Sequence, residues 1–458
     1  MAVTLCRREL LRSALIGATG LVVAACQPKP AAAPQQEAPP TTVPEKEAAA
    51  PAPKEAVLLR LHVRQGAEGT KTEMGIEAFQ SHNPDIRVKL EDFPGAEYPE
   101  KLLTLAAGSV LGDVAFTHVG FYHQMADAGF WTEIDPLVSK YNYDLSVYWQ
   151  TGLEHMQWNG KLYGLPYKGH TGPSGIFYNK EMLEEVGLTD FQPQDYDEII
   201  EAGKKLVKDT TGDGRPDQWG YLYYGDGGWA ITGHLRAWGV DPVSPALGAT
   251  KAELNGEQQM AAVIWMHELV HKHKICPVPG DLDYKQVFLS GAGGFRSGGL
   301  VDWGDRIAVG DRFTMAYASM PKGPGGSLPG FYNHDQMAMN AKTKYPDEAW
   351  KLLSYFCGKE HGIRLGKAEG GGASSPGMRK DVWESEELAA EVPCLSLFRA
   401  HLDELKTHWY AANLNTFKVW SVMNQLYRAM MIEPTPPTQA VFDEANKAVQ
   451  AVLDEPRL

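Results

Sequence analysis

Residues 57–63 read VLLRLHV, and the elements that follow this run decide the fold class. The run is typical of a buried strand, and residues 64–70 form a glycine-containing loop after it. Apolar side chains then recur at helical spacing until the sequence HNP at residues 82–84. Residues 86–90, IRVKL, alternate apolar and polar side chains as a strand does. A strand, a helix and a second strand in this order predict a βαβ unit with parallel strands.

Further helices and strands are expected along the chain after this unit. Further helices are expected at residues 98–107, 180–186, 195–208, 257–273, 347–357, 395–406 and 438–453, and a third strand at residues 113–116. Strands separated by helices predict an α/β fold built on mostly parallel sheets. Glycine-rich stretches interrupt the pattern at residues 224–229, 291–304, 321–330 and 370–372. Such loops allow a ligand to approach the backbone closely.

The N-terminus has the features of an export signal. Arg7 and Arg8 form a twin-arginine start, and residues 13–25 form an uncharged, mostly apolar run that is too short for a permanent membrane span. The run ends in VAAC at residues 23–26, which resembles the site where bacterial lipoproteins are cleaved and lipidated. We therefore expect residues 1–25 to be a signal peptide and Cys26 to carry a lipid. Twin-arginine and general secretory export are both compatible with this signal.

Residues 26–56 are expected to be a linker that begins at the lipidated cysteine. Proline and alanine dominate it, and Val43 is its only large aliphatic residue, so it cannot form a core. In an extended polyproline conformation of about 3.1 Å per residue it reaches up to roughly 90 Å. This composition predicts a tether that holds a soluble body away from the membrane.

The composition of the 458 residues excludes several classes of protein. Hydrophobic residues make up 43% and charged residues 22%, the balance of a soluble globular protein, and the length allows two or three domains. The formal charge of −14 repels phosphate backbones and anionic lipids, so no nucleic-acid partner is expected, and membrane attachment depends on the lipid. The five cysteines show no paired spacing, and Cys276, Cys357 and Cys394 are expected to be mostly free and buried.

Several short motifs follow one another along the body. They are GKLYGLPY at 160–167, FYNKEML at 177–183, VGL at 186–188, DYDEI at 195–199, DGRPDQWGY at 213–221, MP at 320–321 and PDEAW at 346–350. As an ordered set they resemble the extracellular solute-binding proteins of ABC sugar importers, family 1. The resemblance covers about residue 57 to the C-terminus, and Tyr196 stands where the family has a tryptophan.

The resemblance implies a two-lobed α/β fold of the periplasmic-binding-protein type, with two discontinuous lobes joined by a hinge. Residues 57–168 and 321–358 are expected to form the N-terminal lobe, and residues 169–320 and 359–458 the C-terminal lobe. A solute, expected to be a mono- or oligosaccharide, is enclosed between such lobes and delivered to separate ABC permease subunits in the membrane. The resemblance also implies a monomer without catalytic activity or cofactor, located in the periplasm or on the outer face of the cell membrane. A binder of a non-sugar solute on the same fold is an alternative.

A sugar-binding cleft needs flat aromatic side chains under the C–H faces of the sugar and polar side chains around its hydroxyls. Loops after the expected strands supply both kinds. The candidates in the first half of the body are Arg64, Gln65, Glu68, His118 and Tyr122. Those in the second half are Trp229, Asp302, Trp303, Tyr332, His334, Ser374 and Ser375.

Residues 267–271 read HELVH, the pattern of zinc metalloproteases. In those enzymes two histidines one helical turn apart bind zinc, as His267 and His271 would, and the glutamate, here Glu268, activates water. No third ligand is evident, because no glutamate occurs between Glu268 and Glu348. We interpret the motif as part of an amphipathic helix, and a secreted zinc hydrolase is the alternative function.

Residues 209–217, DTTGDGRPD, carry oxygen donors at the spacing of a calcium loop in Asp209, Asp213 and Asp217. The position that should hold a bidentate glutamate is Gly220, so a turn is favoured over a weak calcium site. The sequence contains no P-loop and no dinucleotide-binding fingerprint. The chain is therefore not expected to be the ATPase of a transporter.

Overall fold

The computed structural model describes residues 56–457 except 96, 224–227 and 368–372, and it leaves the side chains of residues 67–69 and 228–230 undescribed. The expected signal peptide, Cys26 and all but the last residue of the linker lie outside these described residues. Residues from 54 onward cluster as one unit.

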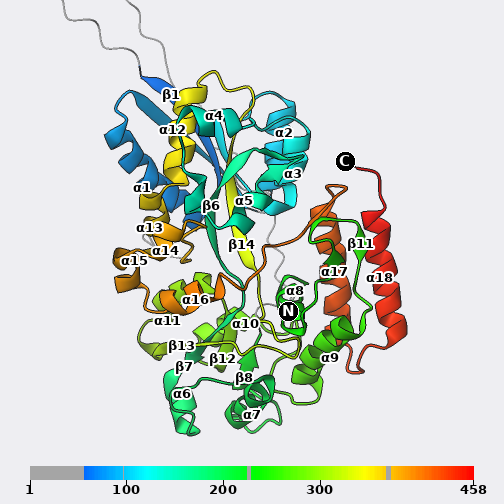
Figure 1. The fold of residues 1–458 in the computed structure, drawn as a ribbon. Coiled ribbons are helices and arrows are strands. Elements are labelled where there is room, and N and C mark those ends of the chain that lie inside the picture. Colours follow the sequence, from blue (N-terminus) through cyan, green and yellow to red (C-terminus); the bar gives the residue numbers. More distant parts are fainter. Residues whose placement is uncertain (1–55, 96, 224–227, 368–372, 458) are drawn as a thin grey trace, which may run out of the picture. The chain divides into compact units, whose positions relative to one another are not determined.

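Two separate sheets organise this unit (Figure 1). The first sheet has the order β2-β1-β3-β14-β6 and comprises β1 (Val57–Arg64), β2 (Ile86–Phe93), β3 (Val114–Thr117), β6 (Gly164–Thr171) and β14 (Tyr332–Met339). The second has the order β13-β7-β12-β8 and comprises β7 (Gly175–Asn179), β8 (Trp219–Leu222), β12 (Gly293–Gly298) and β13 (Met315–Ser319). Strand β1 pairs in parallel with β2 and β3, which confirms the predicted βαβ unit.

Helices cover both sheets. Those near the first sheet are α1 (Ala67–His82), α2 (Tyr98–Ala107), α3 (Val119–Asp127), α4 (Asp135–Lys140), α5 (Gln150–His155), α12 (Pro346–Phe356) and α13 (Lys359–Lys367). The remaining helices are α6 (Lys180–Glu185), α7 (Tyr196–Leu206), α8 (Gly228–Leu235), α9 (Glu257–His271), α10 (Tyr284–Leu289), α11 (Asp305–Val309), α14 (Lys380–Trp383), α15 (Glu386–Glu391), α16 (Leu395–His401), α17 (Thr416–Ile432) and α18 (Gln439–Leu453). Short strands complete the fold: β4 (Gln157–Trp158), β5 (Lys161–Leu162), β9 (Val243–Ser244), β10 (Leu247–Ala249), β11 (Lys251–Ala252) and β15 (Tyr410–Ala411).

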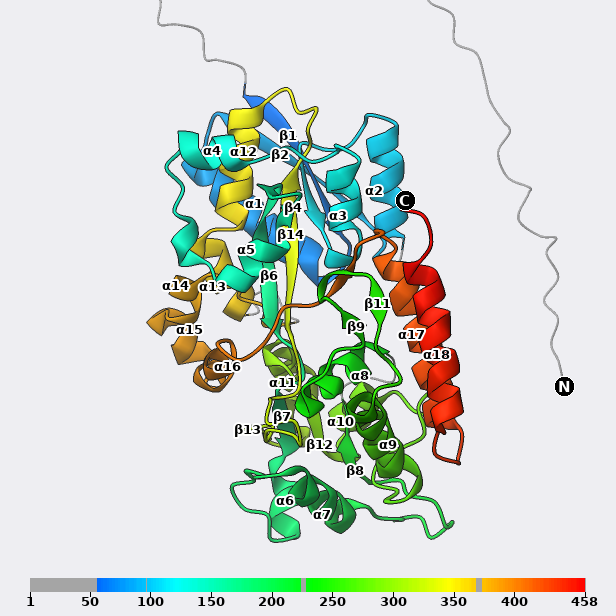
Figure 2. The same ribbon diagram turned by 45° about the vertical axis from the view of Figure 1, so that its right-hand side comes forward.

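The position of each strand in the first sheet explains its composition. Leu61 and His62 of the inner strand β1 face opposite sides of the sheet and are both fully buried, because helices cover both faces. Figures 1 and 2 show α1 and α12 on one side of this sheet and α2 and α3 on the other. Over Ile86–Leu90 the edge strand β2 alternates buried or half-buried apolar side chains with exposed polar ones, as its sequence predicts. The hydroxyl of Tyr98 donates to the carbonyls of His62 and Phe116 and so ties α2 to the sheet.

Two short connections join the sheets, namely residues 172–174 between β6 and β7 and residues 320–331 between β13 and β14. The second segment of the N-terminal lobe is expected to end at residue 358, but α13 begins at Lys359 and packs against α1 and β6 of the first sheet. In α16, by contrast, Phe398 packs against the second sheet, and 6.0 Å separate the centres of the Phe398 and Phe177 rings. We therefore propose lobes of residues 57–171 with 332–392 and of residues 172–331 with 393–457.

Helix α17 lies beside both lobes. It packs against α3 next to the first sheet and against α8 and α9 next to the second (Figure 2). The expected helix at residues 395–406 ends earlier, at His401, and the chain that follows runs between the lobes. Cys276, Cys357 and Cys394 are free and buried, as predicted. No helix within the described ranges is long and apolar enough to cross a membrane.

Candidate functional site

The carboxyl ends of the parallel strands meet where the two sheets are joined. In the first sheet β1 ends at Arg64 and β3 at Thr117, and the connection from β6 leaves from the same edge. In the second sheet β8 ends at Leu222 and β12 at Gly298, beside the other ends of the connections. Ligands of α/β proteins bind beyond the carboxyl ends of parallel strands. A ligand-binding site is therefore expected between these two edges.

Four charged or titratable side chains meet at the edge of the first sheet, and we call them the polar cluster: Arg64, His118, Lys168 and Asp335. Lys168 Nζ lies 3.1 Å from Asp335 Oδ2, Arg64 Nη2 lies 3.9 Å from the same oxygen, and His118 Nε2 lies 3.7 Å from Oδ1. Burial would raise the pKa of Asp335, but the charges of its three neighbours outweigh burial and hold the pKa at about 2. Asp335 is thus a buried carboxylate at neutral pH. Its Oδ1 has no hydrogen-bond partner among the described residues.

Aromatic rings surround the polar cluster. The guanidinium of Arg64 lies 4.6 Å and the ammonium of Lys168 5.3 Å from the centre of the Phe116 ring. The His118 ring stacks on Phe417 of α17, with 5.8 Å between the ring centres and 10° between the planes. Phe417 is 40% exposed, so part of this aromatic side chain is accessible from solvent. A Cβ on Gly120 would lie 2.6 Å from the Phe417 ring, so only glycine permits this contact.

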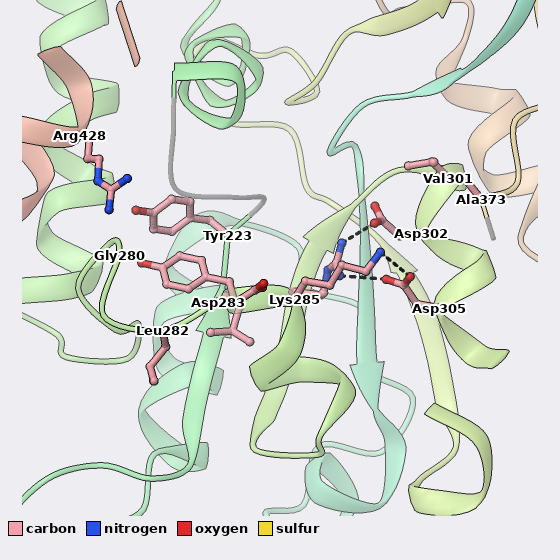
Figure 3. Close-up of a pocket in the computed structure, with 13 residues that line it drawn as sticks. Tyr223, Gly280, Leu282, Asp283, Lys285, Val301, Asp302, Asp305, Ala373 and Arg428 are labelled. Carbon is pink, nitrogen blue, oxygen red and sulfur yellow. Dashed lines mark hydrogen bonds and ion pairs between the residues drawn. The ribbon is translucent and has the colours of Figure 1, made fainter. Parts of the chain in front are cut away.

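A cavity of about 700 Å³ lies at the edge of the second sheet (Figure 3). Its lining includes Tyr223, Asp283, Lys285, Asp302, Ala373 and Arg428. On one wall the buried Arg296 forms ion pairs with Asp302 and, at 3.0 Å, with Asp305, and Lys285 lies 2.8 Å from Asp305. Burial and the neighbouring charge of Asp302 raise the pKa of Asp305. Figure 3 shows Tyr223 and Arg428 on the opposite side of this space.

His170 lies on β6, two residues after Lys168 of the polar cluster. Burial lowers the pKa of His170, and the charges of both Asp302 and Asp335 act in the opposite direction. Its Nδ1 donates to the carbonyl of Thr171 over 2.8 Å, and its Nε2 lies 3.5 Å from Asn333 Nδ2.

The structure brings some of the expected residues to the polar cluster and the cavity and places others elsewhere. Arg64 and His118 belong to the polar cluster, Asp302 lines the cavity, and Gln65 is exposed directly after Arg64. Tyr122, Tyr332 and Ser374 are buried, and their hydroxyls donate to the carbonyls of Met156, Gly377 and Gly366. Ser375 and His334 are also buried. The side chains of Glu68 and Trp229 lie outside the described residues.

Trp303 points away from the cavity that its neighbour Asp302 lines. Its ring packs edge-on against Tyr317 of β13 at 6.0 Å, and Arg306 lies 4.8 Å from the ring centre. It lines a different cavity, of about 480 Å³, between α11 and the start of β13. Trp303 therefore packs within the second lobe and does not face the polar cluster.

Lys168, His170, Asn333 and Asp335 are absent from the residues expected from the sequence. A signal for two of them exists in β6, whose sequence GLPYKGHT has polar side chains at alternate positions in a strand that is otherwise buried. Alternate positions of a strand share one face, so Lys168 and His170 lie on the same side of the sheet. No comparable signal marks Asp335, because it follows a histidine and precedes a glutamine in the sequence.

The HELVH motif serves to pack one helix on another. His267 Nε2 donates to the carbonyl of Glu433 over 2.8 Å, and His271 Nε2 donates to the carbonyl of Met431 over 2.9 Å. These carbonyls lie at the C-terminal end of α17, where a helix lacks internal partners. Glu268 pairs with Lys272 instead of facing the two imidazoles. Within the described ranges no three His, Cys, Asp or Glu side chains are placed to hold a metal ion.

The loop at residues 209–217 has the contacts of a turn. Asp209 accepts hydrogen bonds from the N–H groups of Gly212 and Gly214, and Asp217 accepts from Thr210 and Thr211. The bond from Gly214 is the main cause of the lowered pKa of Asp209. These carboxylate oxygens are occupied by N–H donors of the loop itself, which supports the turn.

Residues 75–391 match the family of bacterial extracellular solute-binding proteins, and the chain belongs to that family. The arabinooligosaccharide-binding protein of Halalkalibacterium halodurans is 26% identical over 141 residues, which are 30% of this chain and 31% of that protein. The match thus spans about a third of that relative's length.

Solved structures share the fold. The maltose/maltodextrin-binding domain from Bdellovibrio bacteriovorus, bound to maltotriose, has a TM-score of 0.70 at 19% identity and covers 87% of this chain and 100% of its own. UgpB from Mycobacterium tuberculosis, in complex with glycerophosphocholine, has a TM-score of 0.73 at 20% identity and covers 87% and 98%. These likenesses confirm the expected two-lobed α/β fold.

Proposed function

We propose that this protein is the substrate-binding subunit of an ABC importer and that it captures a carbohydrate between its two lobes. Membership of the solute-binding family supports capture of a solute, and the arabinooligosaccharide-binding relative supports a sugar. The capture is by binding alone, without a chemical reaction, and the solute passes to permease subunits that are separate chains.

The observation that carries the proposal is the unsatisfied oxygen of Asp335. A buried carboxylate oxygen without a donor is costly, and a sugar hydroxyl is a donor of the right kind. The part of Phe417 that is exposed, next to His118 of the polar cluster, offers apolar surface to the C–H groups of a sugar. Carbohydrate binding needs both a hydrogen-bonding carboxylate and an aromatic surface.

A phosphate-bearing solute is the second candidate. Arg64 and Lys168 bring a guanidinium and an ammonium group together at Asp335, and both groups bind phosphate. The complex of UgpB with glycerophosphocholine shows that a protein of this fold can hold such a solute.

Thermal-shift measurements with arabino-oligosaccharides, maltotriose and glycerophosphocholine separate these candidates. A ligand at 100 times its Kd stabilises the folded protein by about 2.7 kcal/mol. We expect a sugar to stabilise the parent, and we expect Asp335→Asn to lower the affinity for that sugar at least tenfold in titration calorimetry. The control Asp347→Asn, which removes an exposed partner of Lys140, should bind normally. Stabilisation by glycerophosphocholine alone would refute the sugar and favour the phosphate-bearing solute.

We further propose that the protein is a lipoprotein anchored through Cys26 outside the cytoplasm. The export signal and the VAAC sequence support this location, as does the extracellular character of the family. Cys26→Ser should release the protein from the membrane fraction, as measured by fractionation and immunoblot. A Cys26→Ser protein that sediments with membranes like the parent contradicts the anchor.

A further inference from the structure

Three buried histidines and a tyrosine meet where the C-terminal part of the chain contacts the first lobe, and we call them the histidine cluster: His123, His155, His334 and Tyr410. The rings of His123 and Tyr410 stack with 3.8 Å between their centres. His155 lies 5.5 Å from Tyr410, 5.0 Å from His123 and 4.8 Å from His334. The three histidines are at most 2% exposed.

Most ring nitrogens of these three histidines lack a hydrogen-bond partner within the described part of the chain. Both ring nitrogens of His155 and both of His334 lack a hydrogen-bond partner among the described residues, as does Nδ1 of His123. The remaining nitrogen, His123 Nε2, donates to the carbonyl of His155 over 3.1 Å. A proton added to His155 would place a positive charge on a buried ring that has no hydrogen-bond acceptor among the described residues, which is costly.

Tyr410 belongs to a segment that is attached to the second lobe. Its N–H donates to the carbonyl of Ala246 over 3.0 Å, and β15 pairs with β10. Arg236 donates to the carbonyls of Lys406 and Thr407 over 2.7 and 2.9 Å. The three histidines come from α3, α5 and β14 of the first lobe. The contacts of Tyr410 with His123 and His155 are therefore contacts between the lobes, and His334 joins them through its contact with His155.

We propose that the histidine cluster makes this contact acid-sensitive, so that protonation in mildly acidic solution separates Tyr410 from the first lobe and opens the protein without unfolding it. The proposal rests on the hinge motion of the proposed function, but it does not depend on which solute is bound.

The charged groups around the cluster do not offset a new positive charge. His118 and His408 lie near enough to act on the pKa of His155, and both add positive charge if protonated. The Trp158 ring lies 5.7 Å from the His123 ring, and its indole N–H donates to Asp127, which is already paired with Arg457. Asp335 favours a proton on His334, yet burial still lowers the pKa of His334 to about 4. Burial also raises the pKa of Tyr410, so that this ring stays neutral.

The lowered pKa values of the histidines mean that acid favours the open form. A histidine whose pKa is lower in the closed contact than in water favours the closed form above its ordinary value of 6.5, and this advantage is lost as the pH falls. For His334, with a pKa of about 4 when buried, the ratio of open to closed protein rises about 70-fold between pH 7.5 and 4.5 if opening exposes the ring. Burial lowers the pKa of His123 and His155 as well, which strengthens the effect.

Single-molecule energy transfer between the lobes tests the proposal without solute. Donor and acceptor dyes are attached to Thr104→Cys on α2 and Val441→Cys on α18, both exposed positions. The full chain carries Cys6→Ser and Cys26→Ser, and the three other cysteines are buried. We expect the open population to rise at least tenfold from pH 7.5 to 4.5 while near-ultraviolet circular dichroism stays native.

Matched variants locate the effect. His155→Phe with His334→Phe keeps an aromatic ring at both positions and removes no side-chain hydrogen bond within the described residues. It should weaken the acid response to what His123 alone provides. The control His234→Phe replaces another buried histidine whose nitrogens both lack partners, with a pKa of about 4, but it lies on α8 of the second lobe. This variant should respond like the parent.

Three results would overturn the proposal: a parent with no acid response, a double variant that responds like the parent, or loss of native circular dichroism in the parent above pH 4.5. The failure of every solute in the thermal-shift measurements would instead overturn the proposed function and leave this acid response intact.

Discussion

Replacing Asp335 by asparagine tests the electrostatics of the polar cluster. The substitution keeps the shape of the side chain and removes its charge, so Lys168, Arg64 and His118 lose the carboxylate on which they converge. Asp335 is only 6% exposed, so its interactions are weakly screened by water. We expect Asp335→Asn to fold and to be less stable than the parent at neutral pH.

The magnitude follows from the pKa of Asp335, which the surrounding cations lower from the ordinary 3.8 to about 2. A shift of this size corresponds to about 2 kcal/mol of stability. Because the folded pKa is the lower one, this stabilisation is complete above about pH 4 and is lost as the pH falls toward 2. The difference between the parent and Asp335→Asn should therefore be about 2 kcal/mol at pH 7 and should shrink below pH 4.

Urea unfolding of both proteins at pH 7, 5, 4 and 3 measures this difference. Asp347→Asn is the matched control, because it also removes a carboxylate paired with a lysine, but at an exposed position. The control should lose much less stability, since water screens exposed pairs. Equal losses from the two substitutions at pH 7, or a difference that does not depend on pH down to 3, would refute the reasoning.

Three further predictions follow from the contacts of individual residues. Trp303→Ala should destabilise the protein by about 3–5 kcal/mol in urea unfolding, because the ring is buried, and it should leave solute affinity unchanged. Normal stability together with lost affinity would show that Trp303 contacts the solute. His267→Ala should lower the free energy of unfolding by about 1–3 kcal/mol, because the hydrogen bond to the carbonyl of Glu433 is lost. The purified parent should contain less than 0.1 zinc per chain by mass spectrometry, and one tightly held zinc per chain would support the alternative zinc hydrolase. Millimolar calcium should not raise the melting temperature of the parent, and a rise that Asp209→Asn abolishes would show a calcium site.

Local patterns predicted most elements of the fold. The alternation of IRVKL predicted a strand, which is β2. A helix was expected at residues 195–208, and α7 begins there after Asp195, whose side chain accepts from the N–H of Glu198. Helix α17 is absent from the helices expected from the sequence, although Val419, Met423 and Tyr427 recur at helical spacing. The spacing of apolar residues within a short segment predicts whether it forms a helix or a strand, and this prediction does not require knowledge of what the element packs against.

The sequence also placed two of the four residues in the polar cluster. Arg64 and His118 follow strands directly, and in an α/β fold the ends of parallel strands are where ligands bind. Trp303 follows a strand in the same way, yet it packs against Tyr317, because a position after a strand does not fix the direction of the side chain. Adjacent residues such as Asp302 and Trp303 can face different cavities.

Neighbouring residues and their polarity were sufficient to predict the α/β class and the buried free cysteines. They also predict an export signal, which lies outside the described residues. The meeting of Asp335 with Arg64, His118 and Lys168 was not predictable in this way, since it requires β14 to run between β3 and β6. The packing of Tyr410 against histidines of the other lobe was likewise not predictable. Sheet order and the return of the chain between lobes are set by the packing of the whole core, and no local pattern encodes them.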